Sequence, residues 1–294
     1  MSARSADAAA AVVVPVGPDP AEEERLRDLV EAIRAFESEV ALVFVDDAPA
    51  PREGLATGYG ATVVRTGVDV GAVDPYSAMV AGTLSALGAA RGHDLIVKLD
   101  TDAVVAGPFV EALREALHRF PDAGVLGSYD VTCTGVSRDF STWRRPIRRL
   151  ARPVVIRRGP PFVEVVAPAA WRRRISVLRA ARRHGYVAGE HCLGGAYAVR
   201  GRLVDELASR GWLTPAPWLG TWLGEDVVLG LLARACGYAL RGLVGPGEPF
   251  GLARDGLPAP PDDLLANGHT ILHSVKNDPR YSEAELRDHF RARR

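Results

Sequence analysis

Short apolar runs alternate with longer segments of helical periodicity over the first 130 residues, and this alternation constrains the fold more than any other feature. The runs at residues 11–16, 40–45 and 94–99 are almost continuously apolar, as in strands whose two faces are both covered. The segment 20–39 repeats apolar side chains at the spacing of one helix face. The pattern predicts an α/β fold, with a mostly parallel central sheet and helices on both faces, in a single compact domain.

The remaining elements are predicted from the same periodicities and from Gly and Pro breakers. They are strands at 61–64 and 194–199, and helices at 77–91, 108–120 (with Pro108 in its first turn), 169–183, 203–209 and 225–236. A last helix begins at Ser282, where Glu285 completes a capping box.

The ends of the strands are the first place to look for function, because ligands of parallel α/β sheets bind at the carboxyl ends of the strands. We expect the residues that follow the strands to lie along one rim, although they are far apart in the sequence. These residues are Pro15 and Val16, Asp46 and Asp47, Arg65, and Asp100 to Asp102.

Charge, cysteine usage and hydropathy exclude several classes of protein. Lysine plus arginine equals aspartate plus glutamate, at 36 each, so the net charge gives no general electrostatic reason to bind nucleic acid. The three cysteines have no Cys-x-x-Cys spacing, which argues against a disulfide framework or a zinc site and fits a reducing cytoplasm. Residues 1–10 predict a disordered arm, not a signal peptide, and no apolar run reaches the length of a membrane helix. We therefore expect a cytoplasmic protein.

Asp100-Thr101-Asp102 directly follows the apolar run 94–99. Two carboxylates at the end of a buried strand suit a hard cation such as Mn²⁺ or Mg²⁺, which bridges carboxylates and phosphate oxygens. Such a cation stabilises the charge that develops on a leaving diphosphate. The alternative interpretation is an ordinary turn, in which aspartate is common.

Asp46 and Asp47 end the second run, before Pro49. A carboxylate there can accept a hydrogen bond from the N–H edge of a base, or hold ribose hydroxyls. An Asx-turn is the alternative.

Glu225 and Asp226 open the helix predicted at 225–236, where the helix dipole favours acids whether or not they are catalytic. The dipole would also lower the pKa of a carboxyl group and keep it ionised, as a general base requires. Trp222 lies just before this helix. Its indole could provide a flat surface for a sugar ring, or it could pack in the core.

Gly194, Gly195, His273 and Lys276 are weak candidates when each is taken singly. The two glycines precede a predicted strand, where they allow close approach of a ligand or form a tight turn. His273 stands on an apolar segment, where a lone histidine is more often structural than a ligand. Lys276, one of only two lysines in the chain, could reach a phosphate.

Six short motifs occur in the order in which GT-A glycosyltransferases carry them, and the chain resembles this family over residues 11–276, nearest to its inverting, family 2-like members. The motifs are Val13-Val14-Pro15-Val16, Val43-Phe44-Val45-Asp46-Asp47, Leu99-Asp100-Thr101-Asp102, Gly194-Gly195, Gly224-Glu225-Asp226 and the late His273.

The resemblance implies a nucleotide-diphospho-sugar transferase fold with a Mn²⁺ or Mg²⁺ cofactor. Asp102 would bind the metal directly, Asp100 would lie near the ribose or the waters of the metal, and His273 would be a third ligand. Residues 11–130 would bind the donor, for which a UDP-sugar is favoured over a GDP-sugar. The donor residues implied are Pro15, Val16, Asp46 or Asp47, Arg65, Asp100 and Lys276.

The same resemblance assigns the second half, residues 131–294, to the acceptor and to catalysis. Asp226 would act as the base that deprotonates an acceptor hydroxyl, with Glu225 contacting the acceptor, and inversion at the anomeric carbon would follow. Gly194, Gly195 and Trp222 would lie on the acceptor side. The chain lacks the Gln-x-x-Arg-Trp signature of processive synthases, so a single addition is expected.

Two other functions compete with this one. A sugar-1-phosphate nucleotidyltransferase would share the α/β layout, but such enzymes resemble one another in a Gly-rich first loop that ends in basic residues. Residues 15–20 of this chain hold one glycine and no basic residue. A non-catalytic nucleotide-sugar-binding protein would keep the fold, although retention of Asp100, Asp102 and Asp226 together argues against it.

Residues 138–183 hold 14 arginines and only two acids, so the rest of the chain carries an equal excess of negative charge. This Arg-rich insert matches no segment of the family pattern. One hypothesis is a flap that grips an anionic acceptor or the diphosphate. The other is a basic surface for anionic lipid, with peripheral contact at the inner face of the membrane and a lipid-linked acceptor.

Overall fold

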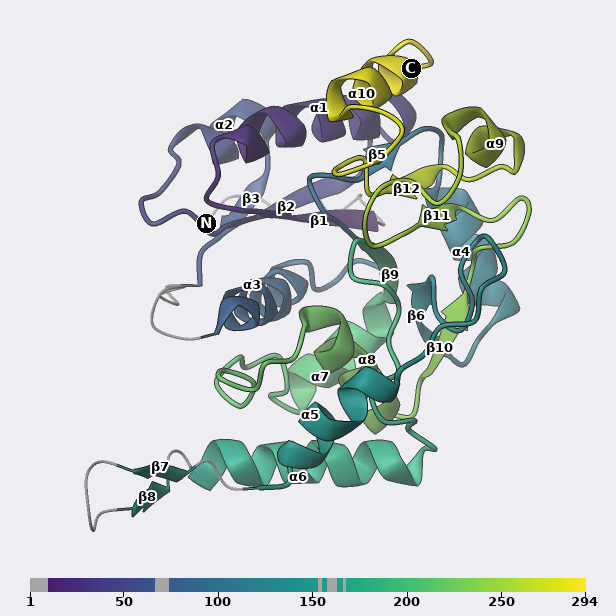
Figure 1. Ribbon diagram of the computed structural model, residues 1–294. Coiled ribbons are helices and arrows are strands. Elements are labelled where there is room, and N and C mark those ends of the chain that lie inside the picture. Colours follow the sequence, from purple (N-terminus) through teal and green to yellow (C-terminus); the bar gives the residue numbers. More distant parts are fainter. Residues whose placement is uncertain (1–9, 67–73, 153–154, 158–162, 166–167) are drawn as a thin grey trace.

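The computed structural model describes residues 10–66, 74–152, 155–157, 163–165 and 168–294 (Figure 1). Residues 1–9 of the predicted arm lie outside the described residues, and so do parts of the Arg-rich insert, at 153–154, 158–162 and 166–167. The first strand begins at Ala10, a residue that the sequence pattern assigns to the arm.

A mixed seven-stranded sheet forms the centre of the molecule. Its strands lie in the order β10 (Ala239–Gly242), β6 (Ala123–Gly127), β9 (Ala196–Arg200), β4 (Leu95–Leu99), β1 (Ala10–Val16), β2 (Ala41–Asp46) and β3 (Thr62–Val64). Neighbours are parallel, except that β9 is antiparallel to both β4 and β6. The predicted mostly parallel sheet is confirmed. The antiparallel strand was not foreseen, because buried strands of either direction give the same apolar run.

Helices cover both faces of this sheet (Figure 1). One face carries α1 (Ala21–Phe36), α4 (Val110–Arg119) and the short α2 (Gly54–Tyr59). The other carries α3 (Pro75–Ala89), α7 (Gly201–Ser209) and α8 (Glu225–Ala235), with α6 (Pro168–Arg183) packed outside α8.

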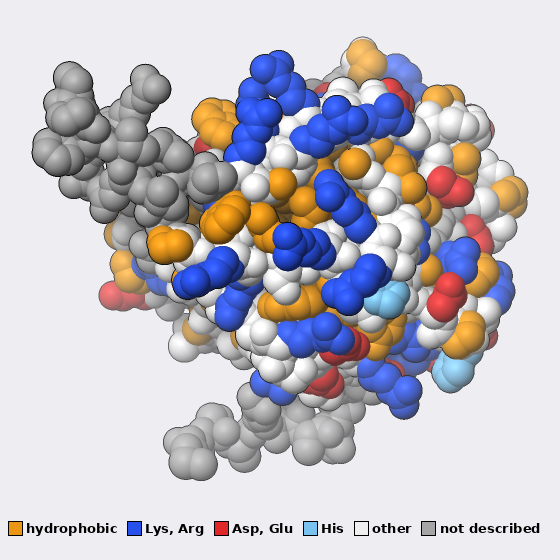
Figure 2. Space-filling model, turned by 90° about the horizontal axis from the view of Figure 1, so that it is seen from below, with side chains coloured by type: hydrophobic (Ala, Val, Ile, Leu, Met, Phe, Trp, Pro, Cys, Tyr) orange, Lys and Arg blue, Asp and Glu red, His pale blue; other side chains and the backbone are white. Residues whose placement is uncertain are grey.

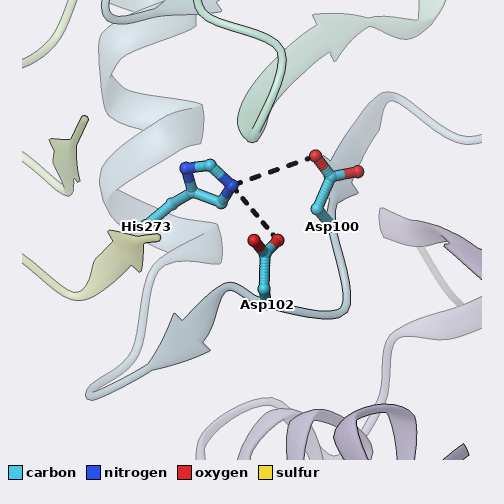
Figure 3. Close-up of side chains that lie close together, drawn as sticks. All are labelled: Asp100, Asp102 and His273. Atoms are coloured by element: carbon cyan, nitrogen blue, oxygen red, sulfur yellow. Dashed lines mark ion pairs between the residues drawn. The ribbon is translucent and has the colours of Figure 1, made fainter. Parts of the chain in front are cut away.

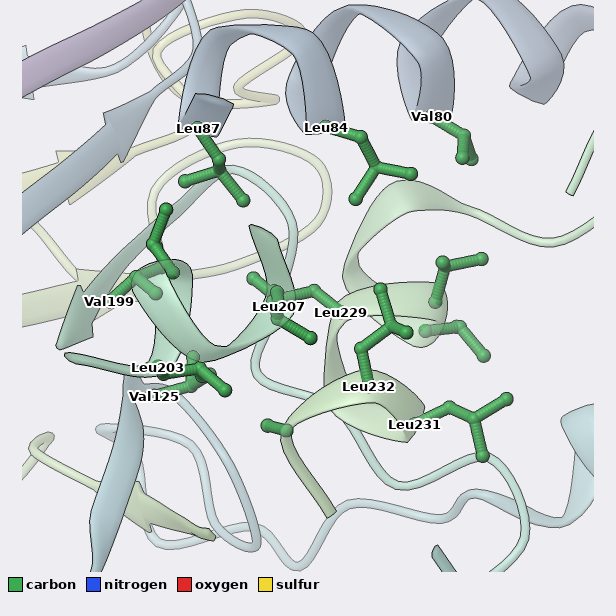
Figure 4. Close-up of a cluster of buried hydrophobic side chains, with 14 of the residues drawn as sticks. Val80, Leu84, Leu87, Val125, Val199, Leu203, Leu207, Leu229, Leu231 and Leu232 are labelled. Atoms are coloured by element: carbon green, nitrogen blue, oxygen red, sulfur yellow. The ribbon is translucent and has the colours of Figure 1, made fainter. Parts of the chain in front are cut away.

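Side chains of successive strand residues enter two different cores, which explains the continuous apolar runs. Val12 and Val14 pack with α1, whereas Val13 packs on the opposite face. Figure 4 shows part of this second core, where side chains of α3 such as Leu84 meet α7 and α8. Both faces of β1 are therefore buried, as predicted.

A second, three-stranded sheet consists of β5 (Val104–Val105), β12 (Ile271–His273) and β11 (Phe250–Leu252). β12 pairs antiparallel with β5, so that Leu272 lies opposite Val104. Because β5 begins two residues after Asp102 and β12 ends at His273, this pairing brings the aspartate motif and the histidine together. Two- and three-residue strands leave no periodicity to detect, so the sequence did not predict this sheet.

The C-terminal helix α10 (Glu283–Arg291) braces the aspartate motif from outside the sheet. Its predicted capping box of Ser282 and Glu285 is confirmed. Arg287 is buried and donates to Asp28 of α1, over 2.8 Å, and to the backbone oxygen of Thr101, over 3.1 Å. The last helix thus holds the turn that carries the two aspartates.

Two predicted details are wrong. Pro108 does not lie in the first turn of α4, which begins at Val110. The first N–H groups, of Phe109 and Val110, are instead satisfied by the carboxylate of Glu37, at 2.6 and 2.8 Å. The Arg-rich insert was predicted to hold one helix, but it contains α5 (Arg144–Arg149), β7 (Val155–Arg157) and β8 (Val163–Val165) besides α6. A short helix, α9 (Pro261–Ala266), lies near the second sheet.

Within the described ranges, no helix is both long enough and apolar enough to cross a membrane.

Candidate active site

Asp100, Asp102 and His273 converge at the carboxyl end of β4 (Figure 3). Nε2 of His273 lies 3.2 Å from Oδ1 of Asp102 and 4.0 Å from Oδ2 of Asp100. Ligand atoms that surround one cation at about 2.1 Å lie about 3 to 4 Å apart, so the three atoms can bind the same ion. The predicted ligands are therefore brought together.

Each of these three side chains is held by one atom and presents another to the site. Nδ1 of His273 donates to the backbone oxygen of Ala253 over 2.8 Å, which leaves Nε2 facing the aspartates. Oδ2 of Asp102 accepts from the hydroxyl of Ser274 over 2.7 Å, and Oδ1 of Asp100 accepts from Lys98 over 2.6 Å. Such supporting bonds orient the ligands of protein metal sites, and here they leave the three presented atoms pointing at one another.

The site carries more negative than positive charge. Burial raises the pKa of Asp100. Burial would also raise the pKa of Asp102, but hydrogen bonds from His273 and Ser274 outweigh it and hold that pKa well below its usual range. Burial alone would lower the pKa of His273, but the Asp102 carboxylate raises it. The two carboxylates thus favour a positive charge at Nε2 of His273, and a divalent cation bound there would take the place of a proton.

Lys98 lies beneath the aspartate motif with no exposed surface. Its ammonium group is 2.6 Å from Asp100 and 3.4 Å from Glu225, and it donates to the backbone oxygen of Gly194 over 2.5 Å. Burial would lower the pKa of Lys98, but these carboxylates raise it, so the side chain stays charged. Sequence reasoning gave Lys98 no role, although a charged residue inside an apolar strand was an available signal.

The two predicted glycines make room for the side chains of the site. A Cβ atom on Gly195 would lie 2.4 Å from the ring of His273. One on Gly194 would lie 2.9 Å from a carboxylate oxygen of Glu225 and 3.1 Å from one of Asp226. The close approach expected at these glycines is therefore made by the protein's own side chains.

Asp226 lies in the first turn of α8, beside a buried histidine that the sequence did not reveal. Its Oδ2 is 3.6 Å from Nε2 of His191. Nδ1 of His191 donates to the backbone oxygen of Gly189 over 2.7 Å, and Nε2 accepts from Arg138 over 2.9 Å. Burial and the charge of Arg138 lower the pKa of His191 to about 4, so the ring is neutral. His191 and Arg138 are 53 positions apart, and no sequence signal connects them.

Burial raises the pKa of Asp226 to about 6, which corrects the expectation that the helix dipole would lower it. The hydrogen bond from the backbone N–H of Val227, at 2.7 Å, opposes this effect only in part. At neutral pH the carboxyl group is still ionised, and its raised pKa makes it a better proton acceptor than an ordinary aspartate.

Glu225 and Trp222 occupy opposite environments. Glu225 is buried, and burial raises its pKa, although Lys98 opposes the effect. Its carboxylate lies 3.4 Å from the ammonium nitrogen of Lys98. Trp222 is 61% exposed and has a φ of 59°, which is uncommon for a bulky side chain. An exposed ring just before α8 remains available to a ligand.

A cleft of about 320 Å³ opens at the strand ends. Six of the predicted residues line it: Pro15, Val16, Asp47, Asp100, Asp102 and Lys276. Lys276 is exposed there, and no described residue donates a hydrogen bond to the carboxylate of Asp47. Glu22, which the sequence did not single out, also lines the cleft, where it accepts a hydrogen bond from Thr101. The predicted rim therefore exists.

Asp46 and Arg65 do not line this cleft. Asp46 is buried, and Arg52 donates to it from Nε over 2.9 Å and from its backbone N–H over 3.1 Å. Burial would raise the pKa of Asp46, but these bonds lower it. Arg65 donates to the backbone oxygen of Ala48 over 2.7 Å. Of the two adjacent aspartates, Asp47 faces the cleft and Asp46 fixes the loop.

A larger cavity of about 740 Å³ lies between α1 and α2. None of the predicted site residues lines it. The smaller cleft is the better candidate because Asp100 and Asp102, two of the three possible metal ligands, line it.

No family model matches the chain, and no curated protein matches it. Among solved structures, the bifunctional glycosyltransferase WbbM matches all of this chain and 50% of its own, at 14% identity and a TM-score of 0.50. Glucosyl-3-phosphoglycerate synthase from Mycobacterium tuberculosis, with Mn²⁺, UDP-glucose and phosphoglyceric acid, matches 90% of this chain and 77% of its own, at 20% identity and a TM-score of 0.43. The galactosyltransferase LgtC, with donor and acceptor sugar analogues, matches 96% and 94%, at 11% identity and a TM-score of 0.45. At this identity, the likeness to WbbM concerns the fold alone.

Proposed function

We propose that this protein, which has the GT-A fold of the nucleotide-diphospho-sugar transferases, is a metal-dependent glycosyltransferase that moves a sugar from a nucleoside-diphosphate sugar to an acceptor hydroxyl. One observation carries the proposal: Asp100, Asp102 and His273 meet at the edge of a cleft formed by strand ends. Ligands of such sheets bind at this edge, so cation and diphosphate would lie side by side.

The side chains present fit a Mn²⁺ or Mg²⁺ ion. Asp102 and His273 would bind it directly, and Asp100 directly or through a water molecule. The imidazole favours Mn²⁺, because Mg²⁺ is held mainly by oxygen ligands. A cation bound there would neutralise the negative charge that develops on the departing nucleoside diphosphate.

The cleft would hold the donor, with a UDP-sugar as the first choice and a GDP-sugar as the alternative. Asp47 has a carboxylate without a described hydrogen-bond donor, so it can accept from a base or from ribose. Pro15 and Val16 form an apolar wall beside it. Lys276 is exposed in the same cleft and can pair with a phosphate oxygen.

Asp226 would be the general base. Its carboxylate takes the proton of the acceptor hydroxyl while the acceptor oxygen bonds to the anomeric carbon and the bond from that carbon to the phosphate oxygen breaks. Attack from the side opposite the leaving group inverts the anomeric configuration. Lys98 and Glu225 support this site from below, and the neutral ring of His191 limits where the carboxylate can move.

The two halves of the chain would divide this work. Residues 11–130 supply the strand ends that would bind the donor, and residues 131–294 supply Asp226 and the acceptor side, with Trp222 as a platform for a sugar ring. Two residues of the second half cross this division, since His273 reaches Asp100 and Asp102 and Lys276 lines the cleft.

The test is release of nucleoside diphosphate from a panel of UDP- and GDP-sugars with Mn²⁺. We expect slow donor hydrolysis, reduced at least about a hundredfold in Asp102→Asn. Asp263→Asn, at an exposed position on α9, is the matched control and should keep full activity.

Three results would contradict the proposal. Binding of nucleotide sugars without turnover, across acceptors, would indicate a binding protein. Formation of a nucleotide sugar from a nucleoside triphosphate and a sugar 1-phosphate would indicate a nucleotidyltransferase. Turnover that survives Asp102→Asn would remove the metal from the mechanism.

A further inference from the structure

Part of the Arg-rich insert carries a group of exposed arginines, which we term the basic face. It consists of nine exposed arginines on α5, on the turn after it and on α6: Arg144, Arg145, Arg148, Arg149, Arg152, Arg172, Arg179, Arg182 and Arg183. None of them forms an ion pair with another described residue. Figure 2 shows basic side chains gathered on the side of the molecule where α6 lies.

The helices that carry the basic face are anchored in the core. Val177, Leu178 and Ala181 of α6 are buried in the core that contains α8. The indole N–H of Trp171 donates to the backbone oxygen of Ala151 over 3.1 Å, which ties the start of α6 to the turn after α5. Ile147 anchors α5 in the same core. The arginines are therefore presented on helices that pack against the core.

Apolar side chains lie between these arginines. Trp171 and Ile175 are partly exposed, and with Arg172, Arg179 and Arg183 they line a shallow hollow of about 460 Å³. A helix that buries one face in a core and presents arginine, tryptophan and isoleucine on the other matches the composition of interfacial helices. Tryptophan in particular favours the boundary between lipid headgroups and acyl chains.

We propose that the basic face docks the protein on the surface of a membrane that contains anionic lipids. The unpaired guanidinium groups attract lipid phosphates and carboxylates, while Trp171 and Ile175 enter the headgroup layer. The rest of the chain carries an equal excess of acids, so an anionic surface would repel it and select one orientation. A nucleic acid would use the arginines but not the apolar side chains among them.

Docking would place the site close to the membrane. α6 packs directly on α8, whose first turn carries Asp226, so one helix layer of about 10 Å separates the axis of α8 from the docking helix. On the proposed function, on which this step alone rests, the acceptor hydroxyl would belong to a molecule held at the membrane surface.

The test is co-sedimentation with vesicles of phosphatidylcholine, with and without phosphatidylserine at roughly a third of the lipid. We expect binding only to the anionic vesicles, weakened by salt. Each arginine that reaches the surface contributes about a fivefold change in partitioning. The variant Arg172→Gln/Arg179→Gln/Arg182→Gln/Arg183→Gln should therefore lose about a hundredfold or more.

A matched variant changes four exposed arginines elsewhere: Arg91→Gln/Arg202→Gln/Arg241→Gln/Arg293→Gln. It alters the net charge equally and should keep vesicle binding within about threefold. Thermal midpoints of both variants show whether each is folded, and donor hydrolysis in solution, measured separately, reports on the proposed function alone.

Equal loss in the two variants would reduce the effect to net charge and overturn the proposal. So would wild-type protein that ignores anionic vesicles but binds duplex DNA or RNA of matched charge. A basic-face variant that keeps vesicle binding but shows a raised KM for a soluble anionic acceptor would assign the arginines to the acceptor instead.

Discussion

Replacing Gly195 by alanine tests whether His273 is a metal ligand without removing the histidine. The new methyl group would lie 2.4 Å from the imidazole ring, whereas ordinary contact begins at 3.4 Å, so the ring has to retreat by about 1 Å. Nε2 now lies 3.2 Å from Oδ1 of Asp102. A retreat of that size breaks a metal–nitrogen bond of about 2.1 Å.

We expect Gly195→Ala to weaken Mn²⁺ binding about 10- to 100-fold, as when the support of a metal ligand is removed. The overpacked contact should also lower the free energy of unfolding by about 1–3 kcal/mol. Calorimetric titration with Mn²⁺ in the presence of UDP measures the first effect, and urea denaturation the second. Gly58→Ala is the matched control, because nothing lies within 4 Å of a Cβ atom there.

His273→Ala completes the design. If Gly195→Ala acts through the imidazole, it should add nothing to the loss of metal affinity already caused by His273→Ala, since the two changes remove the same interaction. Full Mn²⁺ affinity in a folded Gly195→Ala protein would refute the reasoning, as would additive losses in the double variant.

Three other perturbations act on the charges of the site. Asp226→Asn should lower kcat at least about a hundredfold, while wild-type kcat/KM should fall below pH 6, where Asp226 is protonated. Folding raises the pKa of Asp226 to about 6 from about 3.9, so the wild-type protein loses stability as the pH rises through that window. In urea titrations, the free energy of unfolding of Asp226→Asn should therefore exceed that of the wild type by up to about 3 kcal/mol above pH 6, and should equal it below pH 4. Lys98→Met leaves Asp100 and Glu225 buried without the ammonium group that pairs with them, so the free energy of unfolding should fall by about 3–5 kcal/mol. An unchanged urea midpoint would mean that the two carboxyl groups are protonated. Mn²⁺ at about a hundred times its Kd should stabilise the wild-type protein by about 2.7 kcal/mol in thermal scans, and a chelator should abolish the gain; Asp102→Asn should show almost none.

The sheet and the position of the cleft could be predicted because they depend on the pattern of apolar residues. Strands covered on both faces give continuous runs, and the carboxyl ends of parallel strands share one edge. The apolar pattern alone therefore predicts Asp47, Asp100 and Pro15 on one rim, and all three line the cleft. The match with WbbM agrees with the fold so predicted.

Contacts between side chains distant in the sequence could not be predicted. Asp46 and Asp47 looked equivalent because the pairing of Asp46 depends on how the loop carrying Arg52 folds back. His191 and Arg138 lie in segments without periodicity, and their contact depends on burial that a sequence does not display. The predicted direction of the pKa shift of Asp226 was wrong for the same reason, because the desolvation of the buried carboxyl group outweighs the effect of the helix dipole.

The arrangement around Lys98 explains why the site needs both of its glycines. Three carboxylates, those of Asp100, Glu225 and Asp226, gather near the buried ammonium group of Lys98. Carboxylates so close repel one another unless each has a partner, so their partners must approach within contact distance. Side chains at 194 and 195 would occupy that space, and only glycine leaves it free for Glu225, Asp226 and the imidazole. Neither glycine has the positive φ that would demand glycine on backbone grounds. The absence of a side chain at these two positions is therefore a requirement of the charges, and a substitution there should disturb the electrostatics of the site before it disturbs the fold.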